Sequence, residues 1–523
     1  MRSGTTPRRR TTLGTLMGVA LLATLLAPVV GTAASATSRT VGSSDPATWT
    51  PFVLTSASQF RLAVPFGNHS VQTRRELRRL EALQAERTPA IRAMVKQWNT
   101  GPATFPWTQE ALNMILVHRP PAFPTRTARI MTLLHVAMYD AVIAAYDSSD
   151  TYHRSHPYAL DKNLRPMFKN TGSTYPDVNS AIAGAAESML TYLFPDEPPS
   201  TFTAMADQAT RSRLYAGVNF PSDVKQGRDL GHYVAAMVIN YGEKDGHLKA
   251  WDFAGSRLCS TAGCRGADEG YYVPTAPTFQ WPPTDPMASK WTTWYLDTPS
   301  QFLPPPPPSY GSQAWFDQLA AVKSANDTAT PDQLQTAFFW DDGPGTYSPS
   351  GHWNSLAMQY AGNAGMSTED TARLFAILNT TVWDAFVAAW NSKYVYWTLR
   401  PVTAIRERPT ILGQPNPYYD PNWLPNIATP TFPSYVSGHS TVSASAARVL
   451  QFFFPDSNPD PGLIDHINGP DGSIDQIAQQ VSDSRVSAGI HYPIDCTAGL
   501  VLGREVARLA LQRAIADGAG PAA

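Results

Sequence analysis

The sequence lacks several features that would assign it to other classes of protein. Alternation of apolar and polar residues, the pattern of a half-buried strand, is scarce along its 523 residues, which argues against a mainly β fold. The formal net charge is only −2, so there is no basic excess to attract nucleic acid, and no nucleic-acid partner is expected. With 43% hydrophobic residues, the chain is nevertheless able to bury a large core.

Long apolar runs are also rare. After residues 1–36, no stretch approaches eighteen consecutive apolar residues, so no membrane span is expected in the mature protein. Residues 1–36 themselves combine a basic start, an apolar run from Leu13 to Val30 and the small-residue exit Ala34-Ser-Ala36. This pattern predicts a cleaved export signal and a secreted protein, with a retained membrane anchor as the alternative. Arginines ahead of Leu13 suit the twin-arginine route as well as the ordinary secretory route.

Cysteine occurs only three times. Cys259 and Cys264 enclose four residues, a spacing that an oxidising compartment can close into a small disulfide loop. Cys496 is left over, and its apolar surroundings predict a buried structural thiol rather than a reactive one.

What the chain does contain is an imperfect internal repeat. Ser212–Asp223 aligns with Ser484–Asp495, 272 residues further on, and the two segments match at six of twelve positions. Asn219 in the first copy corresponds to His491 in the second. Two further pairs keep the same order, namely Ala128–Ala145 with Ala372–Ala389 and Thr174–Pro176 with Thr431–Pro433. Since the repeat sets a shared scaffold, residues found only in the later copy are the candidates for function.

Helical periodicity of the apolar residues predicts an all-α protein made of two related bundles, with the active site in the C-terminal bundle. Ala128–Ala145 and Ala372–Ala389 are apolar almost all round, each interrupted by one aspartate, Asp140 or Asp384. Both are therefore expected to be buried central helices.

Three other segments are also predicted to be helical. Asn179–Leu193 and Ser440–Phe454 resemble the two central helices, and Val71–Asn99 is expected to form one outer, supporting helix. The run Pro304–Pro308 is expected to be an extended surface spacer, with docking into a partner's groove as the alternative. The expected divisions are residues 1–36 (signal peptide), 37–125 (N-terminal supporting segment), 126–240 (first, non-catalytic bundle), 241–330 (proline-rich connector with the cysteine pair) and 331–523 (catalytic bundle).

Three short blocks in the later half combine cations, a hydroxyl and imidazoles. The first, Lys393-Tyr-Val-Tyr-Trp-Thr-Leu-Arg400-Pro401, places two cations at and beyond the end of a buried helix. Taken alone, such cations are more often solvated charges that suit the helix dipole.

The second block is Phe432-Pro-Ser-Tyr-Val-Ser-Gly-His439, which runs directly into an apolar helix. It places the Ser437 hydroxyl, the Gly438 N–H and His439 at a helix N-terminus, where free N–H groups and the dipole favour an anion. A serine that only caps the helix is the alternative.

The third block contains Arg485, His491 and Asp495 ahead of another helix. One ring nitrogen of His491 is offered to the site, while Asp495 is expected to hold the other ring N–H and fix the tautomer. A purely structural His–Asp pair is the alternative. It explains poorly why the first copy retains Arg213 and Asp223 but has Asn219.

Together the blocks supply three fixed cations, Lys393, Arg400 and Arg485. One contact between a cation and an anion at ~4 Å, at an effective dielectric constant of about 20, is worth on the order of 4 kcal/mol before desolvation. Three such contacts, two of them from directional guanidinium groups, would hold a tetrahedral oxyanion strongly. The first copy has Ser149 and His156 at the positions of Lys393 and Arg400, so it is not expected to bind the anion.

The ordered set Lys-x6-Arg-Pro, Pro-Ser-x-x-Ser-Gly-His and Ser-Arg-x5-His-x3-Asp resembles the vanadium-dependent haloperoxidases and the type 2 phosphatidic acid phosphatases, which share one site. The resemblance covers residues 331–513 and reaches the first half only through the repeat. This sequence departs from that of many members at Val436, where those members have proline directly before Ser-Gly-His.

The resemblance implies that vanadate is the cofactor, that phosphate can occupy the same site, and that hydrogen peroxide, a halide and a small organic acceptor are the substrates. It implies that vanadate is held by Lys393, Arg400, Ser437, Gly438 and Arg485. His491, backed by Asp495, would bond directly to vanadium. His439 would help move protons while the halide attacks the polarised peroxide and leaves as hypohalous acid.

Pro349–His352 also spells Pro-Ser-Gly-His, but it precedes the Lys/Arg block, so its order excludes it from the set. The segment Phe339–Gly343 before it resembles the haloperoxidase segment whose aspartate pairs with the site arginine. That likeness implies that Asp342 supports Arg485.

Three features favour haloperoxidase over phosphatase: the long two-bundle chain, the Asp342 segment, and the aromatic residues Trp390 and Phe432. By resemblance, these two aromatic residues line the halide side of the site, with core packing as the alternative. A phosphatase would use His491 as nucleophile on a phosphoester and His439 as the acid for the leaving group. A secreted binding protein with a decayed site is a third possibility. The complete set of charged residues in the later half argues against it.

Overall fold

A computed structural model describes residues 44–118, 124–249, 266–343, 345–455 and 474–519, and it confirms the all-α fold. The helices before residue 250 are α1 Val71–Ala85, α2 Pro89–Trp98, α3 Phe105–His118, α4 Pro124–Tyr152, α5 Pro157–Leu160, α6 Val178–Leu193, α7 Pro199–Ala216 and α8 Pro221–Gly242. Those after it are α9 Gln313–Asp327, α10 Pro331–Phe339, α11 Ser348–Asn363, α12 Thr368–Tyr396, α13 Pro401–Glu407, α14 Gly438–Phe453, α15 Ile474–Ser487 and α16 Pro493–Ala516.

Strand structure within the described ranges is limited to the antiparallel pair β1 Thr410–Ile411 and β2 Gln414–Pro415. Cys496 is buried and free, as expected. Residues 1–36, Cys259 and Cys264 lie outside the described residues.

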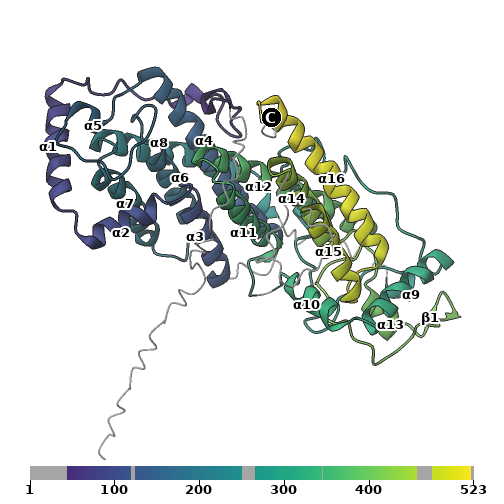
Figure 1. The fold of residues 1–523 in the computed structure, drawn as a ribbon. Helices are drawn as coiled ribbons and strands as arrows, with labels where there is room; N and C mark the ends of the chain where they lie inside the picture. The colour runs from purple at the N-terminus through teal and green to yellow at the C-terminus, as the bar shows by residue number, and fades with distance from the viewer. Residues whose placement is uncertain (1–43, 119–123, 250–265, 344, 456–473, 520–523) are drawn as a thin grey trace, which may run out of the picture. The chain divides into compact units, whose positions relative to one another are not determined.

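The long apolar helices α4 and α12 pack against each other at the centre of the fold (Figure 1). α4 also contacts α6 and α8, while α12 contacts α14 and α16, so each long helix carries the helices of its own half. Within the described residues, Pro124–Leu160 is the one helical stretch long and apolar enough to cross a membrane. Its apolar window is 100% buried within the protein, as in the core helix of a soluble protein.

The aspartates that interrupt the two central helices bind backbone segments. Asp140 accepts hydrogen bonds from the backbone N–H groups of residues 52–54, at 2.8 to 3.0 Å. Asp384 accepts the same three bonds from residues 294–296, at 2.8 to 3.1 Å. The buried carboxylate is tolerated because three N–H groups donate to it. In turn, the carboxylate gives these N–H groups an acceptor that they would otherwise lack. The internal repeat found in the sequence did not pair residues 52–54 with residues 294–296.

The structure corrects two details of the sequence analysis. The segment Val71–Asn99 is two helices, because Pro89 begins α2 and the Thr88 hydroxyl caps it by accepting from the Ile91 N–H. The pairing of Thr174 with Thr431 is also wrong. The Thr174 N–H donates to the Arg154 carbonyl as that of Ser434 donates to Thr398, so Ser434 is the equivalent residue.

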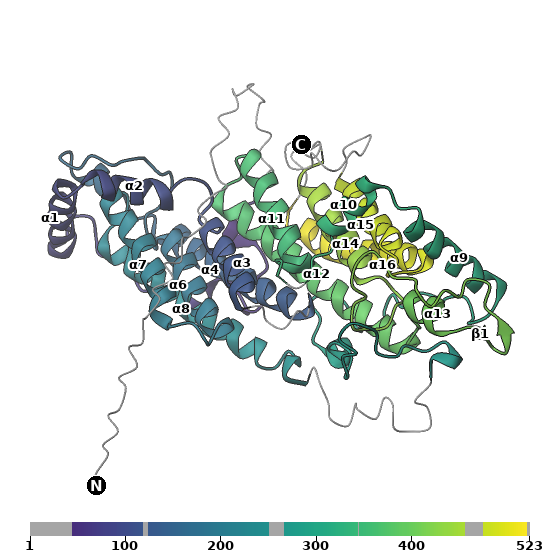
Figure 2. The same ribbon diagram turned by 90° about the horizontal axis from the view of Figure 1, so that it is seen from below.

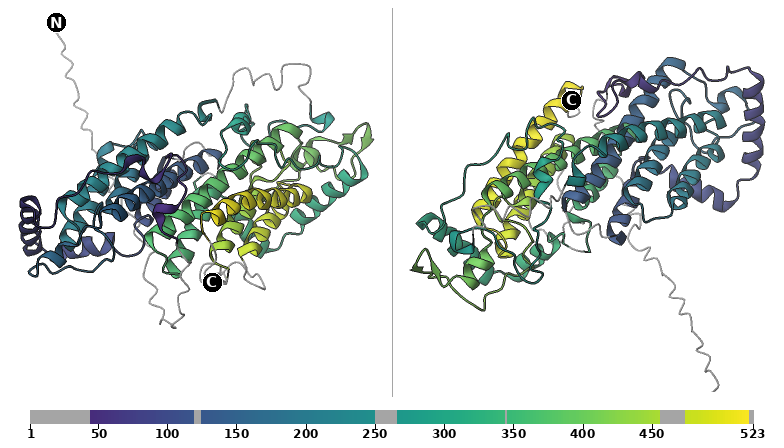
Figure 3. Two further views of the ribbon diagram at one scale, coloured as in Figure 1. Left: turned by 90° about the horizontal axis from the view of Figure 1, so that it is seen from above. Right: turned by 180° about the vertical axis from the view of Figure 1, so that it is seen from behind.

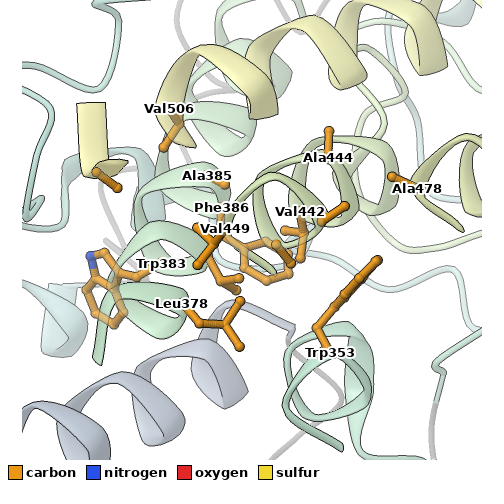
Figure 4. Close-up of a cluster of buried hydrophobic side chains, with 14 of the residues drawn as sticks. Trp353, Leu378, Trp383, Ala385, Phe386, Val442, Ala444, Val449, Ala478 and Val506 are labelled. Atoms are coloured by element: carbon orange, nitrogen blue, oxygen red, sulfur yellow. The ribbon is translucent and has the colours of Figure 1, made fainter. Parts of the chain in front are cut away.

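The helices α14, α15 and α16 contact one another and lie close together in every view (Figures 2 and 3). Their apolar side chains meet those of α11 and α12, with Phe386, Val442 and Val449 near the centre of the cluster (Figure 4). Close approach of α16 to α14 depends on Gly503, where an added Cβ would lie 2.0 Å from the Thr441 carbonyl oxygen. This approach brings the start of α16 against the start of α14, and the Ser437 N–H donates to the Asp495 carbonyl.

Candidate active site

His491 lies in the turn between α15 and α16 and is 1% exposed. Its Nδ1 is 2.9 Å from Asp495 Oδ2, which also accepts from the Ser434 hydroxyl at 2.5 Å and from the Tyr492 N–H at 3.2 Å. Since the carboxylate can only accept, Nδ1 carries the proton and Nε2 keeps its lone pair. Burial raises the pKa of Asp495 to about 6 and lowers that of His491 well below its usual value.

Ser434 is a site residue that the sequence analysis quoted in a motif but gave no role. Its hydroxyl and the His491 ring share one oxygen of Asp495. The sequence feature that could have identified Ser434 is its position in the Pro-Ser-x-x-Ser-Gly-His block.

Arg400 is fully buried at the start of α13 and faces His491. Its Nη1 lies 3.2 Å from His491 Nε2 and donates to the Ile490 carbonyl at 2.7 Å, while Nε donates to the Phe432 carbonyl at 2.8 Å. Nη2 is buried and has no hydrogen-bond partner among the described residues. Burial lowers the pKa of Arg400 to about 10, so the group remains a cation at neutral pH.

Arg485, in the last turn of α15, is also fully buried. Its Nη2 donates to the Ala337 carbonyl at 2.8 Å, and both Nη2 and Nε donate to the Ser484 hydroxyl. Nη1 lacks a partner in the part of the chain that the structure describes. Burial lowers the pKa of Arg485, and the charge of Asp341, followed by that of Asp342, opposes this effect.

Lys393 is held differently from the two arginines. Its Nζ donates to three backbone carbonyls, those of Pro433 at 2.9 Å, Ser434 at 3.0 Å and Val436 at 2.5 Å. An ammonium has three N–H donors, so all three are used by the loop that leads to Ser437. Burial and then the Arg400 charge lower the pKa of Lys393. Lys393 therefore contributes its charge and fixes this loop rather than offering a free N–H.

Ser437 is the N-cap of α14, and its hydroxyl accepts from the Ser440 N–H at 3.3 Å. Gly438 begins the helix, and a Cβ there would lie 3.3 Å from the Trp390 ring and 3.9 Å from Lys393 Cε. The lack of a side chain at Gly438 thus lets the Trp390 ring pack closely, while the distance to Lys393 is that of an ordinary contact.

His439 projects from the first turn of α14, and its Nε2 lies 3.1 Å from the Asp341 carbonyl oxygen. Nε2 therefore donates to that carbonyl. Burial and the Arg485 charge lower the pKa of His439, which favours the neutral imidazole at neutral pH.

Asp342 does not bond to Arg485, which corrects the direct contact implied by the resemblance. Its Oδ1 is 2.9 Å from His352 Nδ1 instead, and the His352 ring stacks on Trp340 with the ring centroids 4.3 Å apart. Asp342 acts on Arg485 only through its charge, and the charge of the neighbouring Asp341 has the larger effect. Sequence reasoning missed Asp341, whose carbonyl holds His439. The Pro349–His352 motif thus lies next to the candidate site without supplying a cation to it.

Trp390 and Phe432 pack on each other with ring centroids 5.0 Å apart and face the cations. Lys393 Nζ lies 4.8 Å and the Arg400 guanidinium 5.0 Å from the Phe432 ring centroid. Both rings are buried, and the Trp390 N–H donates to the Thr284 carbonyl. They form an apolar wall beside the positive charges.

The structure brings the predicted residues together around one imidazole. The charges of Arg400, Lys393, His439 and Arg485 all act on His491 and lower its pKa, after burial itself. Buried cations close to one another repel, and an unpaired buried charged donor costs more than the roughly 1 to 3 kcal/mol typical of a neutral one. An oxyanion among these groups would neutralise the charge and accept from Arg400 Nη2 and Arg485 Nη1. The arrangement therefore fits a tetrahedral oxyanion.

The corresponding position in the first half holds the protein's own carboxylate. Arg213 Nε lies 3.1 Å from Asp177 Oδ1, and Nε and Nη2 both donate to Asn219 Oδ1, at 3.2 and 3.0 Å. Asp223 forms a buried ion pair with Arg154. Asp177 caps α6 as Ser437 caps α14. These contacts leave Arg213 paired where Arg485 is not.

Several known proteins are similar to this chain. A family model described as the VCPO second helical-bundle domain matches residues 196–245 and 373–468. The vanadium chloroperoxidase of Curvularia inaequalis is 24% identical over 409 residues, which cover 65% of this chain and 64% of that protein. An undecaprenyl-diphosphatase of Sulfolobus acidocaldarius is 32% identical over 128 residues, covering 24% of this chain and 49% of the relative. The chain thus spans less than two thirds of the length of either relative.

A solved structure shares the fold as well. The crystal structure of a bacterial vanadium-dependent iodoperoxidase superposes with a TM-score of 0.62 and 23% identity, covering 79% of this chain and 97% of that one. The resemblance of this chain to the vanadium-dependent haloperoxidases, within the superfamily that they share with the type 2 phosphatidic acid phosphatases, is therefore confirmed.

Proposed function

We propose that this protein is a vanadate-dependent haloperoxidase, which oxidises a halide with hydrogen peroxide to hypohalous acid that halogenates organic acceptors. One observation carries the proposal. The lone pair of the buried His491 Nε2 faces a cluster of fixed cations in which Arg400 Nη2 and Arg485 Nη1 have no hydrogen-bond partner among the described residues. The names of the relatives at moderate identity point to the same chemistry.

The residues present fit vanadate or, in its place, phosphate. Arg400 Nη2 and Arg485 Nη1 would donate to its oxygens, together with the N-terminal N–H groups of α14, while Lys393 adds charge. His491 Nε2 is the one donor atom suited to bond the metal, and Asp495 holds its ring in that tautomer. When bound, vanadate supplies a Lewis acid that polarises peroxide.

His439 is the proposed proton carrier. Its neutral form, favoured by the surrounding cations, takes a proton from incoming peroxide and returns it to the departing oxygen. The Asp341 carbonyl keeps the ring oriented through Nε2. Trp390 and Phe432 would bound the halide side of the site, where their apolar surface excludes water.

A phosphatase is the second candidate, favoured by the likeness to the undecaprenyl-diphosphatase. His491 Nε2 would then attack the phosphorus, the cations would stabilise the charge on its oxygens, and His439 would protonate the leaving group. The same buried cations serve both reactions.

One paired assay separates the two. Purified protein is tested, with and without added orthovanadate, for peroxide-dependent halogenation of a phenol and for phosphate release from a simple ester. We expect only the vanadate-loaded protein to halogenate. Ester hydrolysis without halogenation would establish the phosphatase, and failure to bind either anion would leave a binding protein with a decayed site.

We also propose that the protein is exported with removal of residues 1–36 and that its two halves derive from an internal duplication. The matched contacts of Asp140 and Asp384 support the duplication. N-terminal sequencing of protein recovered outside the cell tests the export signal, and an intact leader there would contradict it.

A further inference from the structure

A cavity lies beside Asp495, the carboxylate that bonds to His491. It has a volume of about 310 Å³, and Asp495 is among its lining residues. Its walls come from the proline run, from α9, from the end of α12 and from the first turn of α16. Figure 1 shows α9 and α13 at the end of the bundle from which α16 starts. Arg400, Arg485 and His491 do not line it, and Asp495 is the residue that it shares with the candidate oxyanion site.

The lining of this cavity is mainly aromatic. Five rings contribute to it, those of Tyr271, Tyr310, Trp315, Tyr396 and Tyr492. The Trp315 ring lies edge-on to Tyr310 at 4.8 Å and tilted to Tyr492 at 6.2 Å between centroids. Flat apolar walls of this kind bind planar rings by stacking and edge contacts.

Two hydrogen bonds fix the wall formed by the proline run. The Tyr396 hydroxyl donates to the Pro304 carbonyl at 2.5 Å, and the Tyr435 hydroxyl donates to the Pro305 carbonyl at 2.7 Å. On the opposite wall, Gln318 of α9 accepts from the Ile494 N–H at 2.8 Å. The proline run is therefore part of a built cavity as well as a connector.

The polar groups of the cavity indicate what it binds. Tyr492 is 4% exposed, and its hydroxyl has no hydrogen-bond partner among the described residues. The buried hydroxyl of Tyr310 is likewise unpartnered within them. A buried hydroxyl without a partner is costly, and each of these phenols can donate to an acceptor on a ligand.

The charges around the cavity favour a neutral ligand. No lysine or arginine lines it, and the carboxylates of Glu269 at its exposed edge and Asp495 at its buried end disfavour an anion. Arg400 lies close enough for its charge to act on Tyr492, which disfavours an organic cation at the buried end.

We propose that this cavity binds a neutral aromatic molecule of one or two rings that carries a hydrogen-bond acceptor such as a ketone. The rings of the ligand stack within the aromatic walls, and its acceptor atom accepts a hydrogen bond from the Tyr492 hydroxyl. The proposal stands independently of the proposed function, because binding here needs neither vanadate nor turnover.

Isothermal titration calorimetry on the full-length mature protein tests this. The probe is 2-acetylnaphthalene, and the matched ligand without an acceptor is 2-isopropylnaphthalene. We expect saturable 1:1 binding of both, with the ketone tighter. Tyr492→Phe should weaken ketone binding by about 2- to 10-fold, the usual net effect of one hydrogen bond, and leave the hydrocarbon unchanged.

Tyr139→Phe is the control, because the Tyr139 hydroxyl bonds to the Thr50 carbonyl of the N-terminal half. It should change neither affinity. If Tyr492→Phe does not fold, Tyr310→Phe and the comparison of the two ligands on unmodified protein carry the test. The proposal is overturned if neither ligand saturates, if ketone and hydrocarbon bind equally, or if benzyltrimethylammonium binds more tightly than the ketone. None of these results bears on halogenation.

Discussion

Arg213 and Arg485, which the sequence repeat aligns with each other, should respond differently to the same substitution. Arg213 is paired with the buried carboxylate of Asp177, whereas Arg485 donates to the Ala337 carbonyl and the Ser484 hydroxyl and its Nη1 has no partner among the described residues. Replacing Arg213 with methionine leaves Asp177 buried without its counter-ion, which typically costs about 3 to 5 kcal/mol. In protein dialysed free of anions, Arg485→Met removes the desolvation cost of a buried charge as well as its hydrogen bonds, so its effect should stay within about 1 kcal/mol.

The stability gained on adding orthovanadate should be larger for Arg213→Met than for Arg485→Met. A ligand at 100 times its dissociation constant stabilises the folded state by about 2.7 kcal/mol. We expect this full gain in the wild type and in Arg213→Met. One cation contact at ~4 Å is on the order of 4 kcal/mol before desolvation. If half of this contact energy remains after desolvation, Arg485→Met binds vanadate roughly 30-fold more weakly than the wild type does. At the same vanadate concentration that variant would gain only about 1 kcal/mol.

The assay is urea denaturation followed by circular dichroism, with and without vanadate. The reasoning is refuted if Arg485→Met is as destabilising as Arg213→Met in anion-free buffer. Equal stabilisation of both variants by vanadate would also refute it, because the anion would then bind elsewhere.

Three further predictions test other parts of the molecule. Asp140→Ala and Asp384→Ala each leave one buried and two part-buried N–H groups without their acceptor, so each should lower the free energy of unfolding by roughly 1 to 3 kcal/mol, and an effect in only one of them would contradict the equivalence of the two helices. His491→Ala should abolish activity while Asn219→Ala keeps it at saturating vanadate, and steady-state kinetics giving the opposite pattern would exchange the roles of the two halves. The pKa of His439, lowered by burial and by Arg485, should rise when phosphate binds, because an anion favours the charged imidazole; an unchanged NMR titration would place the phosphate away from His439.

Helical periodicity was sufficient to predict the long helices of the fold. α4, α6 and α12 contain the whole of the predicted segment and α14 contains all of it except Phe454, because their apolar faces are wide and continuous. α4 and α12 extend four residues before and seven residues after the predicted segments. The break before Pro89 was missed because the apolar spacing continues across it. Proline at a first helical turn was the available signal.

The sequence predicted which residues converge on the site better than it predicted how each is held. His491, Arg400 and Arg485 are buried together as expected. The Asp342 interaction was wrong in its direct form, because sequence order cannot show that His352 lies one helical turn inside α11 and takes that carboxylate. The contribution of the Asp341 carbonyl was invisible, since a backbone group has no signature in a sequence.

The three carbonyls around Lys393 have a consequence for the choice of anion. Because every N–H of Lys393 already donates to a carbonyl, Lys393 attracts a bound anion by its charge alone. The bond lengths within the anion therefore have little effect on this attraction. The guanidinium groups, each with one Nη nitrogen that has no partner in the part of the chain that the structure describes, are sensitive to where the oxygens of the anion lie. Discrimination between the larger vanadate and the smaller phosphate should therefore rest with the arginines, while the lysine sets the affinity for both.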